Sequence, residues 1–173
     1  MRPMTTDELS VYVARVEVEY AAELFRSTGI SEQAAREEAR QSQIDLFPEG
    51  RVAPHEQIWV AEDTAGSRVG VLWLAHRDPG TPQEHVWIYD IEVDVARRGQ
   101  GWGRKLLSLA EEQTRALGLR SLRLNVFGQN QVARELYRSQ GFAESRVIMI
   151  KDVGPAGQAS MPSPPWAASR HRR

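Results

Sequence analysis

A turn rich in glycine and arginine separates a strand pattern from a helix pattern in the middle of this chain. Residues 97–107 read RRGQGWGRKLL and contain three glycines and four basic side chains. The segment before it, His85 to Val95, alternates like a strand, and the segment after it, Trp102 to Leu117, has the apolar spacing of a helix. Glycines let backbone N–H groups converge, and a helix N-terminus carries partial positive charge. This arrangement predicts a binding site for an anionic group.

The order of the remaining elements predicts the fold class. Two helices come first, over residues 6–29 and 31–44, and two strands joined by a short polar turn follow them. The predicted strands are Gln57–Glu62, Arg68–Ala75, His85–Val95, Leu119–Phe127 and Phe142–Val153, and the later helices are Trp102–Leu117 and Asn130–Gln140. This order predicts an α/β (α+β) fold with a mixed sheet that is parallel around the two later helices.

The chain divides by composition near residue 153. A chain of 173 residues is most simply one domain, which we assign to residues 1–153. No strand is expected before the first helix, because residues 1–6 are few and include Pro3. From Gly154 onward the chain is rich in Pro, Ala and Ser, and such a composition buries too little apolar surface to order itself. Residues 154–173 are therefore predicted to form a disordered tail.

Composition also indicates which classes of partner to expect and in which cellular compartment the protein works. The net charge of −1 gives no overall attraction to nucleic acid or to an anionic membrane, so neither is expected as a partner. The absence of cysteine excludes disulfides, thiol nucleophiles and cysteine metal sites, and it fits a reducing compartment. The first residues lack the apolar core of a signal peptide, and no run approaches ~20 apolar residues. We expect a cytoplasmic protein without a metal site, and a homodimer is left open.

Two nucleotide-binding motifs fit the glycine turn only loosely. A Walker phosphate loop needs Ser or Thr after its lysine, but Leu106 follows Lys105. A dinucleotide fingerprint needs a third glycine where Arg104 stands, and an acidic residue at the end of the next strand, where Leu119 to Val126 has none. Both motifs are excluded. What remains is Arg98-x-x-Gly101-x-Gly103, which taken alone is also compatible with a plain turn carrying solvated arginines.

A second pattern follows the next predicted strand. Residues 130–142 read NQVARELYRSQGF, which contains Asn-x-x-Ala-x-x-x-Tyr followed by Gly-Phe. A strand, Arg-x-x-Gly-x-Gly, a helix, a strand and then this pattern together resemble the GNAT superfamily of N-acetyltransferases, over about Val69 to Ile150. The resemblance implies the GNAT fold. In that fold a mixed central sheet splays between the two parallel strands that hold acetyl-CoA, with helices on both faces.

The resemblance also implies where acetyl-CoA binds. Its pyrophosphate would lie on the N–H groups of the glycine turn, and its pantetheine would pair with the end of the preceding strand. An amide near Val93 would polarise the thioester carbonyl. Asn130 matches a residue that bonds pantetheine, and it is also a good helix N-cap. The predicted cofactor-binding residues are Val93, Val95, Arg98, Gly99, Gln100, Gly101, Trp102, Gly103, Arg104, Asn130 and Tyr137.

Three residues are candidates for the chemistry. Tyr137 matches the family's tyrosine near the sulfur, where it would protonate the departing thiolate; from the sequence alone it is equally a core tyrosine. A protonated amine needs a base, and Glu92 is the first candidate and Asp90 the second, because alternation places both on one strand face near the thioester. Their alternative role is that of exposed strand acids. Family branches that use a glutamate in the next strand have it where Asn125 stands, and Asn125 cannot accept a proton.

The resemblance implies an acetyl-CoA-dependent N-acetyltransferase that acts on a primary amine of a small molecule or a peptide. The amine would attack the thioester directly within a ternary complex. The alternative is a non-catalytic acyl-CoA-binding or sensor domain of the same fold, which would have no need of Tyr137. The acceptor side would be built from the two N-terminal helices and from the loops 46–55 and 77–84, and the sequence does not identify the acceptor, the acyl length or the oligomeric state.

Overall fold

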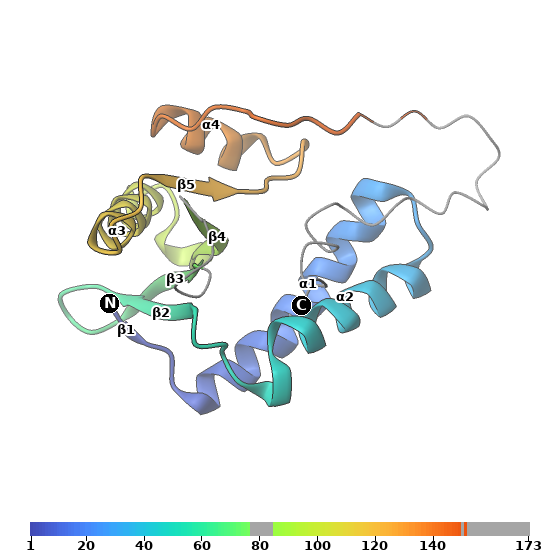
Figure 1. The fold of residues 1–173 in the computed structure, drawn as a ribbon, viewed down its shortest axis with the longest axis horizontal. Helices are drawn as coiled ribbons and strands as arrows, with labels where there is room; N and C mark the ends of the chain where they lie inside the picture. The colour runs from blue at the N-terminus through green and yellow to red at the C-terminus, as the bar shows by residue number, and fades with distance from the viewer. Residues whose placement is uncertain (77–84, 150, 152–173) are drawn as a thin grey trace. The chain divides into compact units, whose positions relative to one another are not determined.

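The computed structural model of the protein describes residues 1–76, 85–149 and 151. These form two compact units (Figure 1). The sheet unit comprises residues 1–5 and 52–145, and the helical unit comprises residues 6–51 and the described residues after 145. The predicted tail, residues 154–173, and the predicted acceptor loop, residues 77–84, lie outside the described residues.

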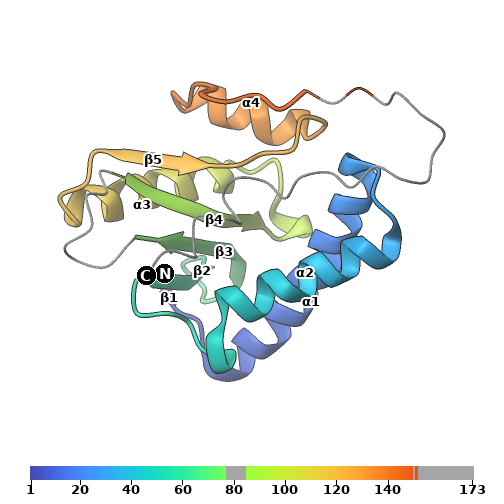
Figure 2. The same cartoon turned by 45° about the vertical axis from the view of Figure 1, so that its right-hand side comes forward.

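The sheet unit is built on a mixed sheet that has five strands in the described part of the chain, in the order β1-β2-β3-β4-β5. Neighbours from β1 to β4 are antiparallel, whereas β4 and β5 are parallel (Figure 2). The strands are β1 Arg2–Pro3, β2 Glu56–Glu62, β3 Arg68–Ala75, β4 His85–Val93 and β5 Ser121–Leu124. The mixed α/β class and the parallel portion next to the glycine turn are confirmed.

The short strand β1 corrects the prediction that no strand precedes the first helix. Arg2 pairs with Val60 and Pro3 with Trp59. The N–H of Met4 donates to the carbonyl of Ile58 at 3.0 Å, so the intervening Pro3 lies where the strand's N–H would point away from β2. A proline is tolerated there because an edge strand needs donors on one side only.

Helix α3, Trp102–Ala116, covers one face of this sheet. Its apolar residues recur at helical spacing, and Leu106, Leu107 and Ala110 are almost fully buried. Leu107 and Ala110 form a cluster with Leu72, Leu74, Val86 and Ile88 of β3 and β4. Each fully buried leucine stabilises the fold by about 2 kcal/mol, so α3 and the two central strands form the rigid base of the glycine turn.

A β-bulge at Tyr89 determines which way the acidic residues of β4 point. Trp73 pairs with Asp90 and Leu74 with Ile88, which leaves Tyr89 as the extra residue. Before the bulge, Val86 and Ile88 face the α3 side; after it, Ile91 and Val93 do so. Without the bulge, Asp90 and Glu92 would share the face of Ile88. The bulge therefore removes both carboxylates from the apolar core.

The prediction of a last strand over Phe142–Val153 is wrong for the residues that the structure describes. Residues 142–149 and 151 form neither helix nor strand. Glu144 accepts hydrogen bonds from Arg134 and Arg138 of α4 at 2.7 and 2.6 Å, so the chain after Gly141 is tied to this helix instead of to a sheet edge. The apolar side chains that suggested a strand, Val147, Ile148 and Met149, are exposed. A strand pattern without a pairing partner does not make a strand.

The helical unit contains α1, Thr6–Thr28, and α2, Glu32–Leu46, which pack against each other. Ser31 caps α2 as predicted, accepting a hydrogen bond from the N–H of Ala34 at 3.2 Å. A short 3-10 turn, η1 at Pro48–Gly50, follows α2. Among the described residues there is no helix both long and apolar enough to cross a membrane.

Candidate functional site

Strands β4 and β5 separate where β4 passes the bulge. Their pairing runs from His85 with Ser121 to Ile88 with Leu124, where β5 ends. Strand β4 continues beside β3 as far as Val93, which pairs with Gly70. The other edge of β4, from Tyr89 to Val93, therefore has no strand beside it within the described residues. A ligand that carries amide groups could lie along such an edge in the manner of an added strand.

The glycine turn begins directly after this open edge. A single 3-10 turn, η2 at Val95–Arg97, leads into Arg98, and Gly99 and Gly101 then adopt positive φ angles of +73° and +83°. Left-handed backbone of this kind is costly for residues with a Cβ atom, which explains why glycine stands at both positions. Gly101 is the N-cap of α3 and supplies no side-chain acceptor to the first turn. The first N–H groups of a 15-residue helix therefore begin at this turn, as an anion site requires.

The turn is bonded to the end of β4. The guanidinium Nε of Arg98 donates to the carbonyl of Val93 at 3.1 Å, and the amide of Gln100 donates to the carbonyl of Ala96 at 3.1 Å. The side chain of Val93 packs toward the α3 side, whereas that of Val95 is 77% exposed. Arg104 is exposed in the first turn of α3. These contacts join the two halves of the predicted cofactor site, the strand edge and the glycine turn.

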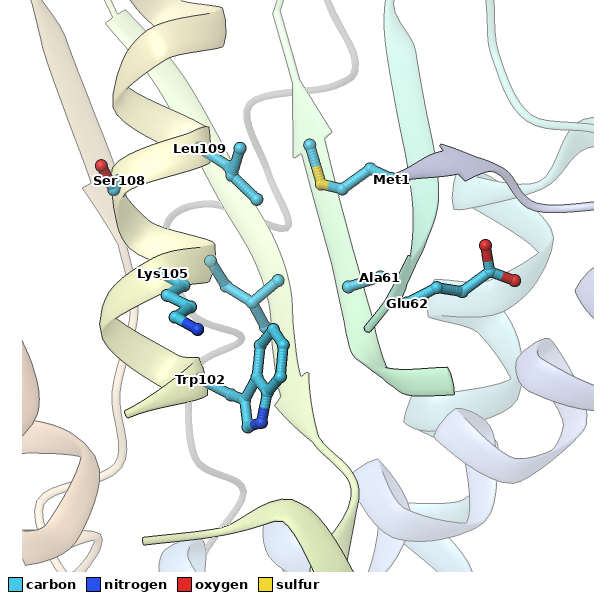
Figure 3. Close-up of a pocket in the computed structure, with 8 residues that line it drawn as sticks. Met1, Ala61, Glu62, Trp102, Lys105, Ser108 and Leu109 are labelled. Carbon is cyan, nitrogen blue, oxygen red and sulfur yellow. The ribbon is translucent and has the colours of Figure 1, made fainter. Parts of the chain in front are cut away.

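Trp102, the first residue of α3, packs its side chain against the sheet. Its ring packs against the cluster of Ala61, Val69 and Leu106, and the Lys105 ammonium lies 4.1 Å from the ring centroid. Figure 3 shows both side chains at a small pocket of about 310 Å³ between α3 and the β1–β2 edge of the sheet. Neither Tyr137 nor the acids of β4 line this pocket. The Trp102 side chain thus has a packing role, and the prediction that its residue binds cofactor concerns its backbone.

Tyr137 and Asp90 come from different elements, and the charge of Asp90 acts on the Tyr137 phenol. Tyr137 lies on α4, Gln131–Ser139, and packs against the apolar cluster that contains Leu107 and Ala110. The rings of Tyr137 and Phe142 are also in contact, with their centroids 5.7 Å apart. Burial and the nearby Asp90 carboxylate raise the pKa of Tyr137 to about 12. The phenol is therefore protonated at neutral pH. Asn130 caps α4, its side-chain oxygen accepting from the N–H of Ala133 at 3.1 Å.

Glu92 lies on the same face of β4 as Asp90 but has a different neighbour. One Nη atom of Arg68 is 4.0 Å from the Glu92 carboxylate, and the Nε atom of Arg68 is 3.4 Å from Asp94. Of the two candidate bases, Asp90 is therefore the one beside Tyr137, and Glu92 is the one beside a cation. The alternation along β4 places Asp90 and Glu92 on one face, as predicted, and Asp94 lies just beyond the strand.

Sequence reasoning missed a buried carboxylate at the start of β2. Glu56 is 5% exposed, and its carboxylate accepts a hydrogen bond from the Trp73 indole at 3.2 Å. Trp73 in turn stacks on Tyr89 at the bulge, with centroids 5.1 Å apart, and it pairs across the sheet with Asp90. A polar residue in an inward-facing position of an apolar strand was the available signal. Asp63 and Arg97, which form an ion pair of 2.9 Å next to the glycine turn, were missed as well.

Comparisons with known proteins identify a family and several similar acetyltransferases. Residues 18–142 match the Acetyltransferase (GNAT) family. The uncharacterised N-acetyltransferase YycN of Bacillus subtilis (strain 168) is 34% identical over 153 residues, which are 88% of this chain and 97% of YycN. A crystal structure of YycN gives a TM-score of 0.81 at 33% identity over the same shares of the two chains. The mycothiol acetyltransferase of Cellulomonas flavigena is 33% identical over 105 residues, 57% of this chain and 30% of that protein.

Proposed function

Since the chain belongs to the GNAT family of acetyltransferases, we propose that it transfers an acetyl group from acetyl-CoA to a primary amine. The observation that carries this proposal is that, among the described residues, strand pairing on one edge of β4 stops at Ile88, and β4 then leads directly into a glycine turn at the N-terminus of α3. An extended amide chain and a pyrophosphate, joined in that order, match these two features. Pantetheine diphosphate has this composition.

The described residues can hold acetyl-CoA in a specific way. Its pantetheine amides would pair with the backbone of β4 near Val93 and Val95, and Asn130 would add a side-chain bond from α4. The pyrophosphate would accept hydrogen bonds from the N–H groups of residues 99–104, favoured by the helix dipole of α3. Arg98, which already bonds the Val93 carbonyl, would link these two parts of the site.

Acetyl transfer then needs one nucleophilic attack and two proton movements. The nitrogen lone pair of the neutral amine attacks the thioester carbon, and a backbone N–H near Val93 stabilises the oxyanion. When the C–S bond breaks, the departing thiolate takes a proton from the Tyr137 phenol, which is protonated at neutral pH. The amine loses its own proton to a base, for which Glu92 and Asp90 are the candidates, directly or through water.

The acceptor is a small molecule or a peptide that carries a primary amine. The relative from Cellulomonas flavigena is named a mycothiol acetyltransferase, and this name supports a small-molecule acceptor. We place the reaction in the cytoplasm on composition, and a homodimer stays a prediction.

Release of free CoA thiol from acetyl-CoA, measured against a library of primary amines, tests this proposal. Amine-dependent thiol release with saturation in both substrates is the expected result. If acetyl-CoA raises the melting temperature and no amine, including N-terminal peptides, releases thiol, the enzyme proposal is overturned in favour of an acyl-CoA sensor. If acetyl-CoA has no effect on melting either, the assignment of the cofactor site fails too.

A further inference from the structure

Two ion pairs of opposite polarity join the β2–β3 hairpin to the segment that precedes the glycine turn. On one side Asp63 meets Arg97, with an Nη–Oδ2 distance of 2.9 Å. On the other side Arg68 meets Asp94, with an Nε–Oδ1 distance of 3.4 Å. The hairpin thus contributes one acidic and one basic side chain, and the segment before the glycine turn contributes a residue of opposite charge to each of them. Such reciprocal pairing fixes orientation, because a slip of the segment would bring like charges together.

The hairpin end of this arrangement is itself held firmly. The Oδ1 atom of Asp63 accepts hydrogen bonds from the N–H groups of Ala65 and Ser67 at 3.0 and 2.9 Å, and Gly66 closes the turn with a φ of +79°. These hydrogen bonds, with that to Ser67 foremost, and the charge of Arg97 hold the pKa of Asp63 below its usual value. Asp63 therefore presents its second oxygen, Oδ2, to Arg97 as a fixed anion.

Arg97, the partner of Asp63, lies immediately before the glycine turn, whose N–H groups would bind pyrophosphate. Arg97 is the last residue of η2, and its N–H donates to the Asp94 carbonyl at 2.7 Å. Hydrogen bonds within the segment, from Arg98 to Val93 and from Gln100 to Ala96, are local and set its shape. The two ion pairs attach this segment to the β2–β3 hairpin, together with the hydrogen bond from the Asp94 N–H to the Val69 carbonyl at 2.9 Å.

We propose that Asp63 and Arg97 are positioning residues for acetyl-CoA, which hold η2 and thereby set the place of the glycine-turn N–H groups against the end of β4. The inference rests on the proposed function, because it assigns a role in binding the same substrate. Neither residue touches the substrate. A partly exposed ion pair changes an equilibrium by up to about fivefold, so the expected effect is a modest weakening of acetyl-CoA binding with unchanged chemistry.

Variants that keep the hairpin intact test this role. Asp63→Asn retains an oxygen for Ala65 and Ser67 but puts an amide, which cannot accept, toward Arg97. Arg97→Gln removes the cation, and Arg97→Lys restores it. Arg115→Gln is the matched control, because Arg115 forms an ion pair of 2.6 Å with Glu111 on the exposed face of α3, in a pair that does not include the turn.

The readouts are the KM for acetyl-CoA, kcat, and the dissociation constant of CoA measured by calorimetry. Arg97→Gln and Asp63→Asn are each expected to raise KM and the dissociation constant by about two- to fivefold, with kcat within about twofold of wild type. The double variant should be no worse than either single one, Arg97→Lys should recover most of the affinity, and Arg115→Gln should match wild type. Wild-type affinity in Arg97→Gln, or effects that add in the double variant, would overturn the positioning role while leaving the enzyme proposal standing. A wild-type protein that binds no CoA would overturn both.

Discussion

The phenol of Tyr137 on α4 and the carboxylate of Asp90 on β4 are electrostatic neighbours, and burial together with this neighbour raises the pKa of the phenol to about 12. Asp90 follows the bulge at Tyr89, which turns its side chain away from the apolar core. A phenol in this position keeps its proton at every pH at which the protein is expected to work.

Replacing Tyr137 by phenylalanine should slow turnover and leave substrate binding intact. The change removes only the hydroxyl, so the ring keeps its packing against Phe142, and the departing thiolate loses its proton donor. General acid catalysis contributes ~100-fold or more, so we expect kcat to fall by about that factor with the KM for acetyl-CoA unchanged. Thiol release under saturating amine measures this. Turnover equal to wild type would remove Tyr137 as the acid.

The same phenol predicts a loss of stability at high pH. Folding raises its pKa from 10.0 to about 12, so the folded state favours the neutral form. This contribution is fully present below pH 10 and is lost as the pH rises through 12. By linkage, wild type should lose about 2 kcal/mol more than Tyr137→Phe between pH 9 and pH 12. Urea unfolding at both pH values measures the difference, and parallel losses in the two proteins would contradict it.

Features determined by local backbone conformation were predictable from sequence. Each of these features depends on residues within a few positions of one another. They are the glycine turn, the helix caps Ser31 and Asn130, and the two strands of the β2–β3 hairpin. The family pattern adds Tyr137 because its spacing from Asn130 is set by one helix. These are the parts of the site that a short stretch of chain encodes alone.

Features that depend on partners distant in sequence were not predictable. The bulge at Tyr89 shows in the sequence only as a shift of apolar residues from even to odd positions, and the register with β3 is needed to locate it. The pair of Asp63 and Arg97 joins residues 34 positions apart (97 minus 63) through tertiary contact alone. Residues 142–149 have strand composition but are tied to α4 through Glu144. Propensity was overridden there by two hydrogen bonds.

Gly101→Glu should abolish the rise in melting temperature that acetyl-CoA is expected to produce. Gly101 has a φ of +83°, and a carboxylate at the N-terminus of α3 would compete with the pyrophosphate for the same N–H groups. Gly118→Glu is the matched control, because Gly118 also has a positive φ, +71°, and open space around it, but lies beyond the other end of α3. Both variants should lose similar intrinsic stability from backbone strain, and only Gly101→Glu should lose the response to acetyl-CoA. A full response in Gly101→Glu would place the pyrophosphate elsewhere.

Gly70→Ala should destabilise the sheet beneath the candidate site. A Cβ atom at Gly70 would clash with the backbone carbonyl oxygen of Glu92, so β3 and β4 would have to move apart where Val93 pairs with Gly70. Overpacking of this kind costs about 3 kcal/mol, which corresponds to a fall in melting temperature of roughly 6–12 °C for a protein of this size.

Gly128→Ala is the control for this substitution, because nothing lies within 4 Å of the Cβ position at Gly128 and its φ is not positive. Thermal unfolding of the two variants should therefore differ by most of that fall. Since the carbonyl that must move belongs to Glu92, in the part of β4 whose opposite edge would bind pantetheine, Gly70→Ala should also weaken acetyl-CoA binding below its own melting temperature. A Gly70→Ala protein with wild-type stability would mean that the strands separate here at little cost, and the close approach of β3 to β4 would then not be what fixes the edge.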